Sequence, residues 1–152
     1  MSMKKSGVAV IVAAVALLGL TACVSQESTL LSRFAMLRED ATAGDRLPDE
    51  PYDGAYDMVD PDSARYGGEA DGARLWIAVA KQPEGVCVVV VPDASSRAVL
   101  GCGGGVMTGE GEEVLKLSAP SSREVHLLTD GEPRVDTSAW EQVSENLWVE
   151  SQ

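Results

Sequence analysis

The chain contains few of the residues on which catalytic and metal-binding sites depend. Its 152 residues include one histidine, His126, three cysteines and a single phenylalanine, Phe34. A zinc site needs more ligands close together than this, so we expect neither a metal nor another cofactor. The Gly-x-Ser-x-Gly pattern of hydrolase nucleophiles and the P-loop of nucleotide-binding proteins do not occur in the sequence. These absences disfavour the common hydrolase and nucleotide-binding classes.

Basic residues are also few. The chain has 12 of them against 24 acidic residues, and removal of residues 1–22 would leave 10 against 24, a net charge of −14. Nucleic-acid binding depends on a basic surface, and so does flat association with anionic lipid. We therefore expect no nucleic-acid partner.

The first 23 residues hold the most specific motif of the sequence. Lys4 and Lys5 precede an apolar run from Gly7 to Leu20, and Thr21-Ala22-Cys23 follows it. The run has about the length of a signal-peptide core and is short for a bilayer span, which needs roughly 20 residues. This order resembles the signal of bacterial lipoproteins.

The lipoprotein resemblance implies that residues 1–22 are removed and that the Cys23 thiol carries a diacylglyceryl group. Two acyl chains give stable membrane binding where one does not, so the protein would be lipid-anchored on the outer face of the cell membrane. Two alternatives stay open, namely an uncleaved anchor helix from Gly7 to Val24 and a plain secretory signal.

The cysteine count favours one disulfide. With Cys23 acylated, Cys87 and Cys102 are left, and two cysteines in an oxidising compartment tend to pair. The bridge would close a loop of about 16 residues and stabilise the fold by roughly 3 kcal/mol. Buried free thiols are the main alternative, because a metal site would lack further ligands.

Residues 23–61 are expected to form a tether. Within them, Ser28 to Arg38 has apolar residues at helical spacing, which predicts a short amphipathic helix resting on the membrane or docked on the body. From Glu39 to Asp71, eleven acids are offset by two arginines and interrupted by three prolines, which favours a largely extended linker. The acids from Asp57 to Asp62 lack the spacing of an EF-hand, so we expect a solvated spacer rather than a calcium site.

Residues 62–152 carry the signals of a small β domain. Short apolar or alternating runs are separated by turn residues such as Asp71-Gly72, and the β-branched run from Val86 to Val91 is typical of a strand buried on both faces. The expected strands are 63–69, 75–80, 86–91, 98–102, 113–117, 124–128 and 146–150. Residues 138–150 could instead form a helix with two tryptophans on one face. The expected fold is mainly β, a small antiparallel sheet folded as a barrel or sandwich.

His126 and a glycine cluster are the remaining hints of chemistry. His126 lies between Val125 and Leu127 in an expected strand, and a catalytic triad would need a serine and a carboxylate brought to it by the fold. An ordinary strand histidine is the expected alternative. Gly101 and the run Gly103-Gly104-Gly105 loosely resemble a dinucleotide loop, but no βαβ unit or following helix supports one, so we expect a turn.

Six short motifs are spread over most of residues 33–150. They are Asp45-Arg46-Leu47-Pro48, Asp62-Ser63-Ala64-Arg65-Tyr66, Trp76-Ile77-Ala78-Val79, Gly85-Val86-Cys87-Val88-Val89-Val90, Gly101-Cys102 and the ending from Trp140 to Val149. Their order resembles that in a group of uncharacterised actinobacterial proteins that are membrane-tethered or secreted. The resemblance implies an extracytoplasmic domain in which Cys87 and Cys102 are paired, and it carries over no catalytic residue.

The sequence leaves two classes of function open. The favoured one is a lipid-anchored extracytoplasmic protein without enzymatic activity, a binding or accessory module of the cell envelope with an envelope protein as partner. Its binding face would use exposed aromatics, with Trp140 and Trp148 as candidates, although tryptophans in so small a domain more often lie in the core. The alternative is a small envelope enzyme acting on a cell-wall polymer, which would need carboxylates in a cleft with His126.

Overall fold

The computed structural model describes residues 31–49, 54–81, 85–93, 97–104, 109–119 and 123–151. The leader, Cys23 and the start of the expected helix at Ser28 lie outside these ranges. Among the residues described, no helix has the length and apolar composition that a membrane span requires.

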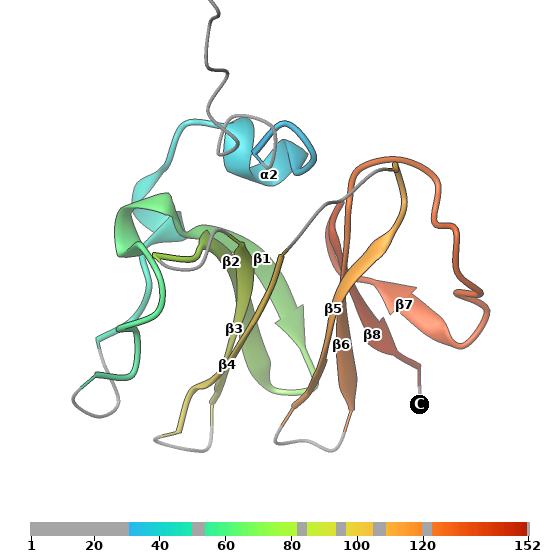
Figure 1. Ribbon diagram of the computed structural model, residues 1–152. Coiled ribbons are helices and arrows are strands. Elements are labelled where there is room, and N and C mark those ends of the chain that lie inside the picture. Colours follow the sequence, from blue (N-terminus) through green and yellow to red (C-terminus); the bar gives the residue numbers. More distant parts are fainter. Residues whose placement is uncertain are drawn as a thin grey trace, which may run out of the picture.

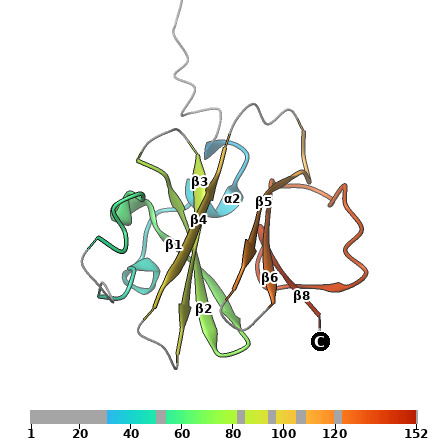
Figure 2. The same ribbon diagram turned by 60° about the horizontal axis from the view of Figure 1, so that its bottom comes forward.

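The described residues form two antiparallel sheets of four strands each (Figure 1, Figure 2). The first sheet has the order β1 (Arg65–Ala70), β2 (Ala73–Val79), β3 (Val86–Pro92) and β4 (Val99–Gly103). The second has the order β5 (Glu113–Ser118), β6 (Glu124–Leu128), β8 (Leu147–Glu150) and β7 (Trp140–Gln142). Before β1 come a one-turn helix, α2 (Ala35–Arg38), and two 3-10 turns, η1 (Ala43–Asp45) and η2 (Pro61–Ser63). The prediction of a mainly β, antiparallel fold is confirmed, and two separate sheets fit a sandwich rather than a closed barrel.

Local sequence accounts for the strands and their turns. Asp71 and Gly72 both have positive φ, 53° and 68°, which is the backbone of the tight turn that joins two twisted strands. The expected strand at 146–150 is confirmed as β8, and the alternative of a helix over residues 138–150 is excluded, because β7 and β8 pair antiparallel with Trp140 opposite Glu150. Three-residue β7 is too short for an alternating pattern to reveal it.

The first sheet is buried on both faces, as the unbroken apolar run of β3 predicts. One face packs against the second sheet, and the core between them includes Leu75, Ile77, Val86, Val88, Val90, Val125, Leu127, Leu147 and Val149. The other face is covered by the segment that precedes β1, in a core that includes Leu47, Tyr56, Val59, Trp76, Ala78, Cys87, Val89 and Val91. The other face of the second sheet carries polar side chains, among them Lys116, Glu124 and His126.

The stretch before β1 is not the extended linker that its composition predicts. Phe34 is fully buried in the core between the sheets, and Leu47, Tyr56 and Val59 are buried against the outer face of the first sheet. These apolar residues are spaced among the acids, so the chain can bury the apolar side chains while the carboxylates stay in water. The described part of residues 31–64 therefore belongs to the folded body, and the spacer expectation is corrected.

Two carboxylates of this stretch accept backbone hydrogen bonds that stabilise its turns. Asp45 accepts hydrogen bonds from the backbone N–H of Thr42 (2.7 Å) and of Tyr66 (2.8 Å), which ties η1 to β1. Burial alone would raise the pKa of Asp45, but these donors outweigh it and the net effect lowers that pKa. Asp60 caps η2 by accepting from the N–H of Asp62 (3.2 Å). In the described part of the chain no group of three or more His, Cys, Asp or Glu residues could hold a metal ion.

Two further expectations are corrected. Residues 32–34 interrupt the predicted helix, because Phe34 takes an extended conformation that turns its ring into the core, and α2 begins after it. Gly101 lies in β4, within the strand expected over 98–102, and Gly103 lies in β4 as well rather than in the turn expected to follow it. A Cβ at Gly103 would collide with the carbonyl oxygen of Val114, so the glycine lets the edge strands β4 and β5 approach.

Candidate functional site

Asp130, two residues after β6, joins the second sheet to the segment around α2. Its carboxylate accepts hydrogen bonds from the N–H of Ala35 (2.7 Å) and from Nδ2 of Asn146 (2.9 Å). It also pairs with Nη1 of Arg38 at 2.8 Å, and its own N–H donates to the carbonyl of Arg33 (2.8 Å). These contacts fix the start of the described chain against a loop almost a hundred residues later.

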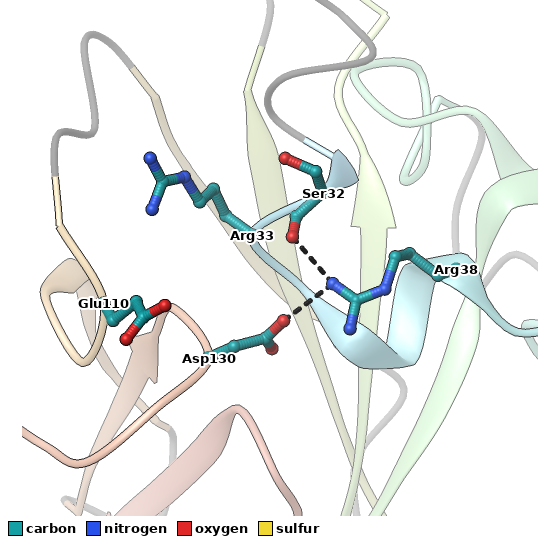
Figure 3. A pocket seen from close by; sticks show the side chains of 5 residues that line it. All are labelled: Ser32, Arg33, Arg38, Glu110 and Asp130. Carbon is teal, nitrogen blue, oxygen red and sulfur yellow. Dashed lines mark hydrogen bonds and ion pairs between the residues drawn. The ribbon is translucent and has the colours of Figure 1, made fainter.

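A pocket of about 360 Å³ opens beside this junction (Figure 3). Its lining is Ser32, Arg33, Arg38, Glu110 and Asp130. Arg38 and Asp130 lie on one side, where Nη1 of Arg38 also donates to the carbonyl of Ser32 (2.7 Å), and Arg33 and Glu110 lie on the other. Among the described residues, neither the Arg33 guanidinium nor the Glu110 carboxylate has a hydrogen bond or ion pair.

The charges of this pocket balance. Two arginines face two carboxylates, and one pair, Arg38 with Asp130, is already closed. The other two groups, Arg33 and Glu110, are each able to bind an oppositely charged group of a ligand. A guanidinium offers five N–H donors and suits phosphate or carboxylate, whereas a carboxylate accepts from an ammonium.

His126, the histidine that the sequence marks out, lies in a second cluster on the outer face of the second sheet. This His126 cluster consists of Glu113, Lys116, Glu124, His126 and Trp140. Nδ1 of His126 lies 2.8 Å from Oε2 of Glu113, and the imidazole stacks on Trp140 with ring centroids 3.7 Å apart. The His126 side chain is only 2% exposed.

The remaining charges of the His126 cluster are also engaged. Nζ of Lys116 lies 2.5 Å from Oε2 of Glu124, and this hydrogen bond raises the pKa of Lys116. Nε2 of His126 is buried without a hydrogen-bond partner, and it is 4.0 Å from the same Glu124 oxygen. No serine hydroxyl bonds to the ring among the described residues, so the geometry brings together a histidine and a carboxylate but no nucleophile.

The three tryptophans do not form one binding face. Trp76 is buried in the outer core of the first sheet, where it packs edge-on against Tyr66. Trp140 and Trp148 are partly buried on neighbouring strands, and Trp148 lies opposite His126 in the register of β6 and β8. The large hydrophobic side chain that is exposed in the described ranges is Met58, at 52%.

Cys87 and Cys102 form a disulfide, as the cysteine count predicts. They lie directly opposite one another on the antiparallel strands β3 and β4. The bond therefore ties an edge strand to the most buried strand of the first sheet. Cys23 lies outside the described residues, so its acylation stays a prediction.

Sequence reasoning did not find the pocket residues. Asp130 is visible in the sequence only as part of an Asp130-Gly131 turn, and Arg33 and Arg38 only as charges on an amphipathic segment. One signal existed, because docking of that segment on the body was among the expectations, but nothing in the sequence indicates which loop receives it.

No protein-family model matches the chain, and no curated protein or solved structure matches it at a significant level. The resemblance to actinobacterial tethered proteins therefore stays a prediction.

Proposed function

We propose that the protein is a lipid-anchored, extracytoplasmic binding module without enzymatic activity, and that the pocket between Arg33 and Glu110 is its ligand site. The observation that carries this proposal is the contrast in access. Arg33 and Glu110 line an open pocket without partners among the described residues, whereas His126 is 2% exposed and packed against Trp140.

The location of the proposed module rests on its cysteines. Disulfides persist in oxidising compartments, and the Cys87–Cys102 bond is consistent with a body outside the cytoplasm. We propose that Cys23 is the acylated N-terminus. The intact mass of membrane-extracted protein should then show loss of residues 1–22 and a gain of lipid. A wild-type protein without lipid, together with a Cys23→Ala variant that stays membrane-bound with its leader uncleaved, would point to the helix anchor instead.

Site-specific photo-crosslinking in native membranes tests the ligand site. A photoreactive amino acid at Ser32 lies in the pocket lining. One at Met58 is exposed in the same tether segment, the described part of residues 31–64, but is not part of that lining. We expect a discrete adduct from position 32 and none from position 58, with the same result in a His126→Ala background. Equal labelling at both positions would contradict a dedicated site.

The envelope-enzyme alternative has one observation in its favour. Glu113 is placed to accept a hydrogen bond from Nδ1–H of His126, which leaves Nε2 as the basic nitrogen, and this is the arrangement by which a carboxylate orients a general base. Turnover of a purified cell-wall polymer that depends on His126, in protein with unchanged folding, would favour this alternative over the binding module.

A further inference from the structure

We infer that the pocket binds a phosphoethanolamine group, with the phosphate against Arg33 and the ammonium against Glu110, and that this group is a headgroup of the bilayer to which the chain is tethered. The inference rests on the proposed function and names the ligand of the same site.

The charge of the pocket selects a zwitterion. Its lining carries two positive and two negative side chains, and the unpartnered pair consists of one of each. A purely anionic ligand would satisfy Arg33 but meet Glu110, and it would approach a mature chain with a net charge of −14. A neutral ligand that presents an anionic oxygen and a separate N–H donor satisfies both groups without a long-range penalty.

The position of the pocket selects a membrane lipid over a distant solute. Ser32 follows Cys23 by nine residues, and an extended chain spans at most about 3.6 Å per residue, so the pocket stays within about 30 Å of the lipid anchor. The contacts of Asp130 with Ala35 and Arg38 hold the lining at the point where the described chain starts (Figure 1, Figure 3). Headgroups surround such an anchor at high local concentration, which favours even a weak site.

The zwitterion is tested with the full-length acylated protein in phosphatidylcholine nanodiscs, by equilibrium dialysis against labelled O-phosphoethanolamine. We expect saturable binding that is about tenfold or more tighter than that of inorganic phosphate or of ethanolamine alone. Arg33→Ala and Glu110→Gln should each weaken it about tenfold or more, because each removes one charged hydrogen-bonding partner. The matched controls Arg46→Ala and Glu141→Gln change exposed residues of the same types away from the pocket and should leave it unchanged.

The bilayer source is tested by repeating the dialysis in nanodiscs that contain phosphatidylethanolamine. If the pocket holds this headgroup, soluble O-phosphoethanolamine should no longer bind, since the lipid already occupies the site. Equal binding in both nanodiscs would overturn the lipid source and assign the pocket to a free or polymer-borne group.

The failure of this inference can be separated from failure of the proposed function. Phosphate that binds as tightly as O-phosphoethanolamine would overturn the zwitterion. Absence of all three probes from the pocket, together with a discrete crosslink at position 32, would overturn the ligand class and leave the binding module standing. Absence of both binding and crosslink would overturn the two proposals together.

Discussion

The pocket beside the tether segment and the His126 cluster each contain a paired cation and carboxylate, yet the pocket is open and the His126 imidazole is covered. Lys116 and Glu124 pair at 2.5 Å in the His126 cluster, and Trp140 covers the imidazole. In the pocket, Arg38 and Asp130 pair in a similar way, but Arg33 and Glu110 lack partners among the described residues.

The difference follows from how each group is positioned. Neighbouring strands hold side chains at fixed, short separations, so opposite charges on one face of the second sheet meet. The pocket lies instead where the loops that carry Glu110 and Asp130 meet the tether segment. Asp130 bonds to the N–H of Ala35 through its carboxylate and to the N–H of Gly111 through its carbonyl, and neither bond pairs the side chains of Arg33 and Glu110. Among the described residues, the charged groups of the two sites that lack partners therefore lie at the junction between segments, whereas those on the second sheet are paired.

The largest expected effect comes from removing the side chain that seats the tether segment. Phe34→Ala should lower the free energy of unfolding by about 3–5 kcal/mol, because the ring is fully buried between the sheets. Urea unfolding followed by tryptophan fluorescence measures it, with Met58→Ala as an exposed control expected to change by less than about 0.5 kcal/mol. Equal effects would show that the segment is not docked and that the pocket does not form.

The disulfide should stabilise the folded body as a whole, with no selective effect on the pocket or on the His126 cluster. The paired change Cys87→Ala with Cys102→Ala should cost roughly 3 kcal/mol, because the crosslink restricts the unfolded chain. Non-reducing peptide mapping should recover the linked pair in protein made outside the cytoplasm. Alkylation of both thiols without prior reduction would contradict it.

A change in the His126 cluster should separate stability from binding. His126→Ala removes a buried ring from its stack on Trp140 and should cost about 2 kcal/mol. Binding of O-phosphoethanolamine should stay within twofold of wild type, measured by the same dialysis. If binding is lost while the fold is intact, the two clusters are coupled and the comparison between them is wrong.

The smallest effect concerns the pH dependence of η1. The pKa of Asp45 is lowered in the folded state. The ionised carboxylate therefore adds to the free energy of unfolding at pH values above the pKa of the unfolded chain, about 3.9, and this gain is lost as the pH falls through the pKa of the folded state. Asp45→Asn should therefore destabilise the protein by about 1 kcal/mol at neutral pH, and this difference should shrink in acid. Urea unfolding at several pH values tests it, with the exposed Asp40→Asn as control. A constant difference across the pH range would exclude ionisation as the cause.

Much of the strand pattern could be predicted, because each strand of the first sheet carries its own signal. Val86 to Val91 is apolar throughout, and Asp71-Gly72 specifies its turn by backbone conformation alone. The tether segment was mispredicted because its composition is acidic on average, while Phe34, Leu47 and other apolar residues lie between the acids at positions that the fold buries. An average over a window cannot show that separation.

The sequence by itself determined the class of the fold, the pairing of Cys87 with Cys102 and the motif that predicts an anchor at Cys23. Each of these depends on residue types and on their short spacing along the chain, which can be taken directly from the sequence. Only the tertiary structure decided that the His126 side chain is buried against Trp140 and that Arg33 and Glu110 line the same open pocket. The members of that pocket lie far apart in the chain, and their proximity depends on Asp130, whose carboxylate accepts from the N–H of Ala35 and whose backbone carbonyl accepts from the N–H of Gly111.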